Sequence, residues 1–285
     1  MSDRFTKIAR LKDTSFRFFG MFSTFFGLVM LVIFISSIFS EGISRISWDF
    51  ITNYPSRNPA KAGIISALAG TLWIIVITAL AAIPIGIGAA IYLEEFSKKS
   101  RLGKIIEINI TNLAGVPSVI YGLLGLEIFG RIMGMGGSIL AGSFTLALLI
   151  LPIIIVATRE AIKAVPSSLR EASYALGASK WQTVKSTVIP SASSGIITGI
   201  IIAISRAIGE AAPLIVVGAL VYVPFVPDSP TSEFTVLPIQ IFNWVSRPQA
   251  EFLVNASAGI IILLGITFLL NSIAVYLRIK RSVKY

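Results

Sequence analysis

Long stretches without a charged residue recur along almost the whole chain, and they constrain its fold more than any other feature. They run through residues 18–40, 62–93, 108–126, 132–158, 186–205, 211–227 and 252–277. Most of them reach the roughly 20 residues that a helix needs to cross a bilayer. With 55% hydrophobic and only 13% charged residues, the chain has more apolar surface than one soluble core can bury. We therefore expect an all-α polytopic membrane protein.

The number of spans depends on how the two runs around Arg206 and Glu210 are interpreted. Only the short segment that holds this charged pair separates the runs, so we interpret them as one long helix. The sequence then predicts six transmembrane helices, at about residues 17–39, 67–93, 107–128, 138–158, 191–222 and 252–277. An even number of spans places both termini on the same side of the membrane.

Positive charges predict which side that is. Most of the 24 Lys and Arg residues lie before the first span, after the second, after the fourth and after the last. These residues are Arg4, Lys7, Arg10, Lys12, Arg17, Lys98, Lys99, Arg101, Lys104, Arg159, Lys163, Arg170, Lys180, Lys185, Arg278, Lys280, Arg281 and Lys284. Because Lys and Arg accumulate in cytoplasmic loops, we expect both termini to be cytoplasmic. The net charge of +10 then reflects membrane orientation, and no nucleic-acid partner is expected.

The chain contains neither His nor Cys, which removes the commonest general base, metal ligands and thiol nucleophile. No segment matches the Walker A pattern, since Gly103-Lys104 is followed by Ile105. A polytopic membrane enzyme is therefore disfavoured, and no metal or prosthetic group is expected in this chain. Any energy from a nucleotide must come from another subunit.

The segment 166–190, between the fourth and fifth predicted spans, carries signals for two short helices. Ser168 with Glu171 and Ser179 with Gln182 have the spacing of capping boxes. Gly177 lies between them and can adopt the left-handed conformation that ends a helix. Pro190, which has no amide donor, is expected to end the second helix. The sequence thus predicts a helical hairpin.

Each helix of this hairpin has an apolar stripe at helical spacing. The stripe residues are Leu169, Ala172, Ala175 and Leu176 in the first helix, and Trp181, Val184 and Val188 in the second. A hairpin packed only on its own membrane helices and a hairpin that docks on a cytoplasmic partner both explain this pattern.

Two charged residues fall inside the fifth predicted span, where a charge costs roughly 2.5 to 3.5 kcal/mol on insertion scales. Arg206 and Glu210 are four residues apart, so they share a helix face and can neutralise each other. One interpretation is a salt bridge that fixes helix packing. The other is a role in an anion path, because a guanidinium binds tetrahedral oxyanions through paired hydrogen bonds.

The third predicted span contains Gly115 and Pro117, which weaken helical hydrogen bonding, and the polar residues Asn112 and Ser118. Broken membrane helices often border a cavity, so Asn112 and Ser118 are candidates for lining the same path. Close packing through small residues is the alternative. It also explains a Gly-x-x-x-Gly spacing at residues 195–199.

Several of these motifs resemble known ones. Glu171-Ala172-Ser173, followed by Gly177 and Pro190, resembles the EAA loop of ABC importer permeases, with Ser173 in place of the usual second alanine. Residues 112–118, 121–123 and 205–213, in this order and spacing, are similar to the PstA family of phosphate-importer permeases. The form Leu-Ala-Gly-Val-Pro-Ser at residues 113–118 favours PstA over the related PstC.

The resemblance covers about residues 62–277 and implies a type I ABC importer permease fold in a bacterial cytoplasmic (inner) membrane. The expected organisation is 1–61 for the cytoplasmic N-terminus, first span and outward loop, 62–277 for the permease domain, and 278–285 for a cytoplasmic tail. The implied partners are a PstC-like permease, two PstB-like ATPases that bind ATP and Mg, and a PstS-like phosphate-binding protein. The resemblance also makes segment 166–190 the ATPase-coupling loop. Its candidate contact residues are Glu171, Ala172, Leu176, Gly177 and Trp181.

Combined with this resemblance, the residues predict a permease subunit of an ATP-driven phosphate importer. Our hypothesis is that Glu210 occupies Arg206 at rest and that arriving phosphate competes for the guanidinium. An importer of another oxyanion, such as sulfate or molybdate, keeps the same architecture. A secondary anion transporter would also use a charged pair in the membrane, but the docking hairpin argues against it.

Overall fold

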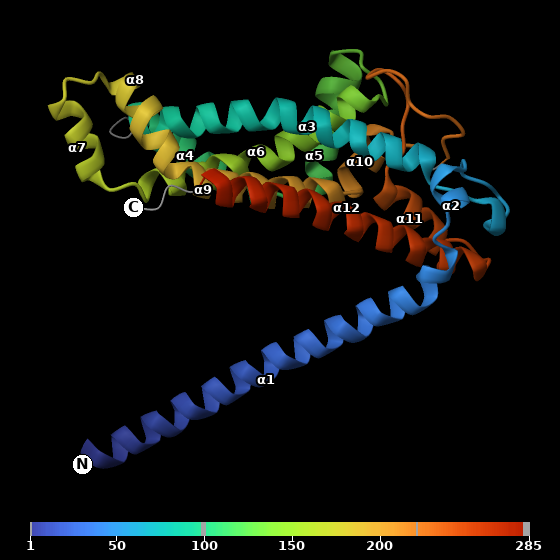
Figure 1. Ribbon diagram of the computed structural model, residues 1–285, viewed down its shortest axis with the longest axis horizontal. Helices are drawn as coiled ribbons and strands as arrows, with labels where there is room; N and C mark the ends of the chain where they lie inside the picture. The colour runs from blue at the N-terminus through green and yellow to red at the C-terminus, as the bar shows by residue number, and fades with distance from the viewer. Residues whose placement is uncertain (1, 98–100, 221, 282–285) are drawn as a thin grey trace.

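A computed structural model describes residues 2–97, 101–220 and 222–281, and this part of the chain is almost entirely helical (Figure 1). Its one β-feature among the described residues is an isolated bridge between Ser138 and Glu233. The α-helices are α1 (Ser2–Gly42), α2 (Trp48–Thr52), α3 (Ile65–Ile91), α4 (Arg101–Leu113), α5 (Ser118–Gly125), α6 (Ile139–Lys163), α7 (Ser167–Ala175), α8 (Lys180–Thr183), α9 (Ile189–Gly209), α10 (Ala212–Val217), α11 (Leu237–Val245) and α12 (Glu251–Arg281). Shorter helical turns are η1 (Ile43–Arg45), η2 (Pro59–Lys61), η3 (Tyr92–Phe96), η4 (Leu126–Ile132) and η5 (Val184–Val188), of which the last three are π-helical. The predicted all-α fold is confirmed.

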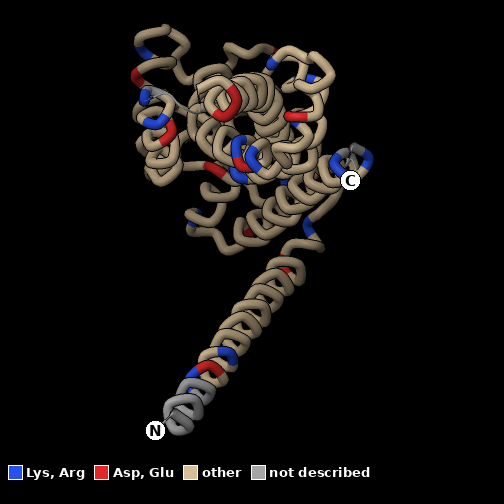
Figure 2. The backbone as a smooth tube through the Cα atoms, turned by 90° about the vertical axis from the view of Figure 1, so that its left-hand side faces the viewer, with Lys and Arg blue, Asp and Glu red and all other residues tan. Residues whose placement is uncertain are grey.

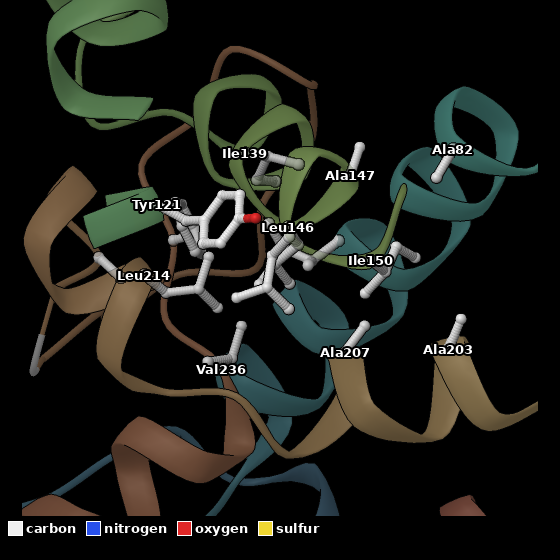
Figure 3. Packing of buried hydrophobic residues seen from close by; sticks show 14 of the residues in the cluster. Ala82, Tyr121, Ile139, Leu146, Ala147, Ile150, Ala203, Ala207, Leu214 and Val236 are labelled. Atoms are coloured by element: carbon white, nitrogen blue, oxygen red, sulfur yellow. The ribbon is translucent and has the colours of Figure 1, made fainter. Parts of the chain in front are cut away.

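Helix α6 is the centre of the bundle and packs against α3 on one side and α9 on the other. Its buried residues join those of α3 and α9 in one apolar cluster, part of which Figure 3 shows. Small residues allow the close contact with α9. A Cβ atom at Gly195 or Gly199 would overlap the side chains of Ala161 and Ala157. The Gly-x-x-x-Gly spacing therefore marks a helix contact.

Helix α1 extends away from this bundle (Figure 1), and its most apolar stretch is completely unburied. It joins the bundle only near its C-terminal end, where Glu41 Oε2 accepts a hydrogen bond of 3.2 Å from Ser257 Oγ. Just after it, Arg45 donates through Nε to Asn255 Oδ1 at 2.8 Å. Arg45 also donates to the carbonyls of Ala60 and Ala62, both at 2.9 Å. These contacts anchor the end of α1 to α12 and to the loop before α3.

Five described helices are long and apolar enough to cross a membrane, and a sixth span results if α4, α5 and η4 are counted as one bent pair. The third predicted span, 107–128, is such a bent pair: its two halves meet at 108°, at the place where Gly115 and Pro117 were expected to weaken helical hydrogen bonding. The break covers residues 114–117. Pro117 has no N–H for a helical hydrogen bond and disfavours helical geometry in Val116 before it.

The prediction of one long helix through Arg206 and Glu210 was wrong. Helix α9 ends at Gly209, and Glu210 has extended backbone angles (φ −82°, ψ 116°). The separate six-residue helix α10 begins at Ala212, with Pro213 in its first turn. Pro213 cannot continue the hydrogen-bond ladder of α9, and its ring would collide with the carbonyl of Gly209 in a continuous helix.

The hairpin helices α7 and α8 lie at one end of the bundle, called here the hairpin end. The N-terminal part of α1 and the C-terminal part of α12 lie on the same side of the molecule as this end in Figure 1. Figure 2 faces the same end and shows Lys and Arg beside the C-terminus and on the near end of the bundle. Helix α12 continues through Arg281 into the predicted tail 278–285. Lys98, Lys99 and Lys284, which entered the charge argument, lie outside the described residues.

Candidate functional site

The 166–190 hairpin turns at Gly177, which has a φ of +83°. The amides of Gly177 and Ala178 donate to the carbonyls of Tyr174 and Ser173, at 2.9 and 3.2 Å, and so close the end of α7. At the start of α8, Ser179 Oγ accepts from the amide of Gln182 at 3.3 Å. In return, Gln182 Oε1 accepts from the amide of Ser179 at 2.7 Å. The predicted glycine turn and this capping box are confirmed.

Two details of the predicted hairpin were wrong. Ser168 does not cap α7: the helix begins at Ser167, with Pro166 in the N-cap position and no side-chain cap. Ser168 therefore already lies inside the first turn. Pro190 does not end the second helix, because helical structure continues from Lys180 to Gly209. The π-turn η5 ends at Val188, two residues before Pro190, so the proline lies in the first turn of α9, where its missing N–H is tolerated.

The apolar stripes of the hairpin divide into an inner and an outer set. Val184 and Val188 are buried, and Leu169 packs against the cluster that contains Val188. The side chains of Leu176 and Trp181 instead remain 90% and 57% exposed. Glu171, Ala172 and Ala175 are exposed on the same hairpin. An apolar tip left uncovered in this way is typical of a surface that contacts another protein.

Ser173, the departure from the usual EAA pattern, lies between the two hairpin helices. Its Oγ atom is 2.9 Å from Thr183 Oγ1, and Thr183 is fully buried. The hydroxyl thus satisfies a buried polar group where an alanine would leave it without this partner. The serine at this position therefore links α7 to α8.

Ion pairs connect the hairpin end to the membrane helices. Arg170 of α7 donates to Glu95 Oε1 of η3 at 2.9 Å through Nη2. Arg159, in the last part of α6, lies 3.4 Å from Glu94 Oε2 and 3.0 Å from Glu107 Oε1 of α4. The sequence analysis used both arginines only as orientation charges. The available signal was the adjacent acidic pair Glu94-Glu95 at the end of a long uncharged run.

At the break between α9 and α10, Arg206 and Glu210 form the expected ion pair. Arg206 Nε donates to Glu210 Oε1 at 3.3 Å, and the two side chains are 42% and 19% exposed. The guanidinium is therefore accessible while its partner is mostly covered. Glu210 also lines a cavity of about 10 Å³ with Thr71 of α3 and Val236, which is enough for at most one water molecule.

The two helix breaks pack on one another. Gly122 of α5 touches α10 so closely that a Cβ atom would lie 2.8 Å from Pro213 Cα. Tyr121 bridges the break of its own span, donating from its hydroxyl to the carbonyl of Leu113 at 2.8 Å. Figure 3 shows Tyr121 beside Leu214 of α10 in the shared core. Residues that follow each break, Tyr121 and Leu214, thus belong to the same cluster.

Asn112 is exposed at the end of α4, and Ser118 is half-buried at the start of α5. Within the described ranges, no hydrogen bond links either residue to Arg206 or Glu210. The structure therefore brings Arg206 and Glu210 together, and it places Asn112 and Ser118 at the neighbouring break, between α4 and α5. A polar contact that the sequence analysis missed joins Ser205 Oγ to Asn271 Oδ1 of α12 at 2.7 Å. Its signal in the sequence was Asn271, one of two asparagines in the last apolar run.

Comparison with known proteins gives the family of the chain. Residues 82–282 match the model of the family described as "Binding-protein-dependent transport system inner membrane component". The chain is 34% identical over 264 residues to the probable ABC transporter permease protein YqgI of Bacillus subtilis, covering 88% of this chain and 90% of that protein. It is 35% identical over 257 residues to the phosphate transport system permease protein PstA of Yersinia pestis, covering 90% and 86%.

Solved structures agree on the fold. The inward-facing MetNI methionine ABC transporter matches with a TM-score of 0.61 at 18% identity, covering 78% of this chain and 95% of that one. An amino acid ABC transporter matches with a TM-score of 0.51 at 21% identity, covering 75% and 90%. From the family match and these relatives, the chain belongs to the binding-protein-dependent inner membrane components, the permease subunits of type I ABC importers.

Proposed function

We propose that this chain is a PstA-like subunit that carries inorganic phosphate across the bacterial inner membrane, with both termini in the cytoplasm. The observation that carries the proposal is the 35% identity to a phosphate permease over 90% of the chain. Further relatives with the same name come from Haemophilus influenzae and Pasteurella multocida, at 32% and 29% identity. The name of YqgI gives no cargo, so transport of another oxyanion is the competing outcome.

The charged break after α9 has the chemistry that this cargo needs. Arg206 offers a planar fork of donors that matches tetrahedral oxyanions, and its 42% exposure leaves it accessible. Glu210 neutralises the guanidinium at rest, so no unpaired charge is left in the membrane. Arriving phosphate competes with Glu210 for Arg206. Exchange of partners releases the anion more readily than a deep trap would. Asn112 and Ser118 are proposed to line the same route.

The exposed tip of the 166–190 hairpin is proposed to dock on the ATPase. Leu176 and Trp181 supply apolar contacts, Glu171 and Ala172 lie beside them, and Gly177 sets the turn between the two helices. A PstC-like permease would complete the pore, two PstB-like ATPases would bind ATP and Mg, and a PstS-like protein would deliver phosphate. On this proposal the chain itself hydrolyses nothing.

Labelled phosphate uptake in cells that lack this chain tests the proposal. The cells are complemented with wild type or Arg206→Gln, and sulfate uptake is measured in parallel. Arg131→Gln is a matched control, because Arg131 also pairs with a glutamate four residues away, Glu127, at 3.0 Å. We expect wild type and Arg131→Gln to restore phosphate uptake, and Arg206→Gln to reduce it by about tenfold or more, as for a lost charge-assisted hydrogen bond.

Membrane levels of each variant and its co-purification with the ATPase are checked first. Full phosphate uptake with assembled Arg206→Gln would contradict the role of the arginine. If wild type restores only sulfate uptake, the proposed phosphate cargo is contradicted, and the proposed importer architecture is not. Uptake that does not depend on ATP would favour a secondary transporter.

A further inference from the structure

We propose that the π-turn η3, Tyr92–Phe96, is the junction that passes movement of the 166–190 hairpin to the broken third span. Glu94 and Glu95 are the positioning residues of this junction. The inference rests on the proposed docking role of the hairpin and adds the internal route by which docking reaches the membrane part of the chain.

Consecutive residues of η3 contact different elements. Glu95 pairs with Arg170 of α7, and Glu94 pairs with Arg159 of α6. Phe96 lies beneath Lys180 of α8, whose Nζ is 4.8 Å from the ring centroid. A π-turn is wider than an α-helical turn and is frequently found at functional sites. Both hairpin helices are therefore attached to the same short turn at the end of α3.

Arg170 attaches α7 to η3 through several charge-assisted hydrogen bonds. Arg170 donates to Glu95 Oε1 through both Nε and Nη2, at 3.2 and 2.9 Å, and to the carbonyls of Val165 and Ile162 at 2.7 and 2.9 Å. The side chains of Arg170 and Glu95 are only 19% and 9% exposed. Loss of one member of a buried, hydrogen-bonded pair leaves an uncompensated charge. The pair therefore holds α7 and η3 together when either one is displaced.

The second step runs from η3 to α4 through Arg159. Its Nη2 atom is shared between Glu94 and Glu107, at 3.4 and 3.0 Å. The side chain is 9% exposed, and its Nε atom has no hydrogen-bond partner among the described residues. A guanidinium has five N–H donors, so Arg159 can exchange one carboxylate partner for another without leaving the site. Such a site supports the two discrete arrangements that coupling between sites requires.

From α4 the path reaches the break. Helix α4 carries Glu107 near its middle and ends at Leu113, whose carbonyl accepts the hydrogen bond of Tyr121 from α5. Gly122, next to Tyr121, lies against Pro213 of α10. A displacement of α4 thus acts on both helix breaks, including the one that holds Arg206 and Glu210.

The test uses the complete transporter, with both permeases, both ATPases and the binding protein, in proteoliposomes. Phosphate transport and ATP hydrolysis are measured on the same vesicles for wild type and Glu95→Gln. The matched control is Glu160→Gln, because Glu160 forms a 2.8 Å pair with Lys163 on the surface beside Arg159 and is 63% exposed. We expect Glu95→Gln to lower the amount of phosphate transported per ATP hydrolysed by about 5- to 10-fold. The rate of ATP hydrolysis should change by less than about twofold. The control should match wild type.

A double-mutant cycle separates coupling from simple loss of structure. The loss in phosphate per ATP in the double variant should be smaller than the sum of the losses in Glu95→Gln and Arg170→Gln, because both single changes break the Arg170–Glu95 link. Additive losses would contradict the inference, as would transport and hydrolysis that fall together with reduced assembly. If Glu95→Gln does not assemble, Arg170→Lys takes its place: it keeps the charge and loses the fork of hydrogen bonds.

The outcomes also distinguish this inference from the proposed function. A wild-type complex that moves sulfate and not phosphate contradicts the cargo, and the ratio is then measured with sulfate. A wild-type complex that moves phosphate, with an unchanged ratio in every junction variant, contradicts the junction alone.

Discussion

Gly177 and Ser173 show how single residues shape the 166–190 hairpin. Gly177 has a φ of +83°, and a Cβ atom built on it would meet nothing within 4 Å. The requirement for glycine there is therefore one of backbone conformation and not of space. Ser173 acts through a contact instead, because its hydroxyl lies 2.9 Å from the buried Thr183 hydroxyl. One residue sets the turn and the other holds the two helices together.

The change Gly177→Ala tests the turn. An alanine at this positive φ should cost about 1 kcal/mol and loosen the end of α7 without blocking any contact. We expect hydrogen exchange of the 173–179 amides to accelerate about fivefold in the assembled complex. Gly265→Ala is the control, since Gly265 also has open space around it but lies in α12 with no positive φ. Unchanged exchange in Gly177→Ala would contradict the conformational argument.

At the scale of elements, prolines have different effects in different helices. Helices α3 and α6 continue through Pro84 and Pro152, and both pack along their length in the bundle. Helix α9 instead stops four residues before Pro213, and α10 then packs on α5. The surrounding contacts therefore decide whether a proline bends a helix or separates two of them.

Replacing Pro213 with alanine should allow α9 and α10 to join, since a proline inside a helix costs about 3 kcal/mol. Spin labels on Ile202→Cys and Ile215→Cys, both exposed positions, report the joining. A continuous helix would separate their backbones by about 20 Å, and wild type should give a different distance. We expect the Pro213→Ala variant to lose most transport while Pro84→Ala retains it. Identical label distances in wild type and Pro213→Ala would refute the role of the proline.

At the scale of the whole molecule, most of α1 lies apart from the bundle, and its N-terminal part lies on the same side as the hairpin end and the C-terminal part of α12 (Figure 1). The large apolar side chains of α1, among them Phe22, Phe26 and Phe34, are exposed. Such a surface needs lipid or another membrane helix around it. The polar anchor at Arg45 and Asn255 lies at the opposite end of α1 from the N-terminus. The hairpin end and the end that holds the Arg45–Asn255 anchor are therefore chemically different.

The absence of cysteine from the sequence makes this topology directly testable. Single cysteines are introduced as Lys12→Cys, Ser168→Cys or Trp48→Cys, and intact cells are treated with a membrane-impermeant thiol reagent. We expect labelling of Trp48→Cys alone, because Trp48 follows α1 and is 76% exposed. All three should react after the membrane is permeabilised. Labelling of Ser168→Cys in intact cells would reverse the proposed orientation.

Much of the fold and part of the candidate site followed from the sequence. Uncharged runs predicted the membrane helices because a bilayer core excludes charge over a fixed length. The glycine turn at Gly177 and the box of Ser179 and Gln182 were predictable because capping depends on residues within one helical turn. The pairing of Arg206 with Glu210 was also local, since only four residues separate them.

Contacts between residues far apart in the sequence could not be predicted from such local patterns. Apolar runs of the sequence contain Pro84, Pro152 and Pro213, yet of these three only Pro213 follows a helix break, because contacts within the bundle keep α3 and α6 continuous. Likewise, Glu95 and Arg170 lie far apart in the chain and carry no periodic signal. Local rules act over a few residues, whereas a buried ion pair depends on which helices the three-dimensional packing brings side by side.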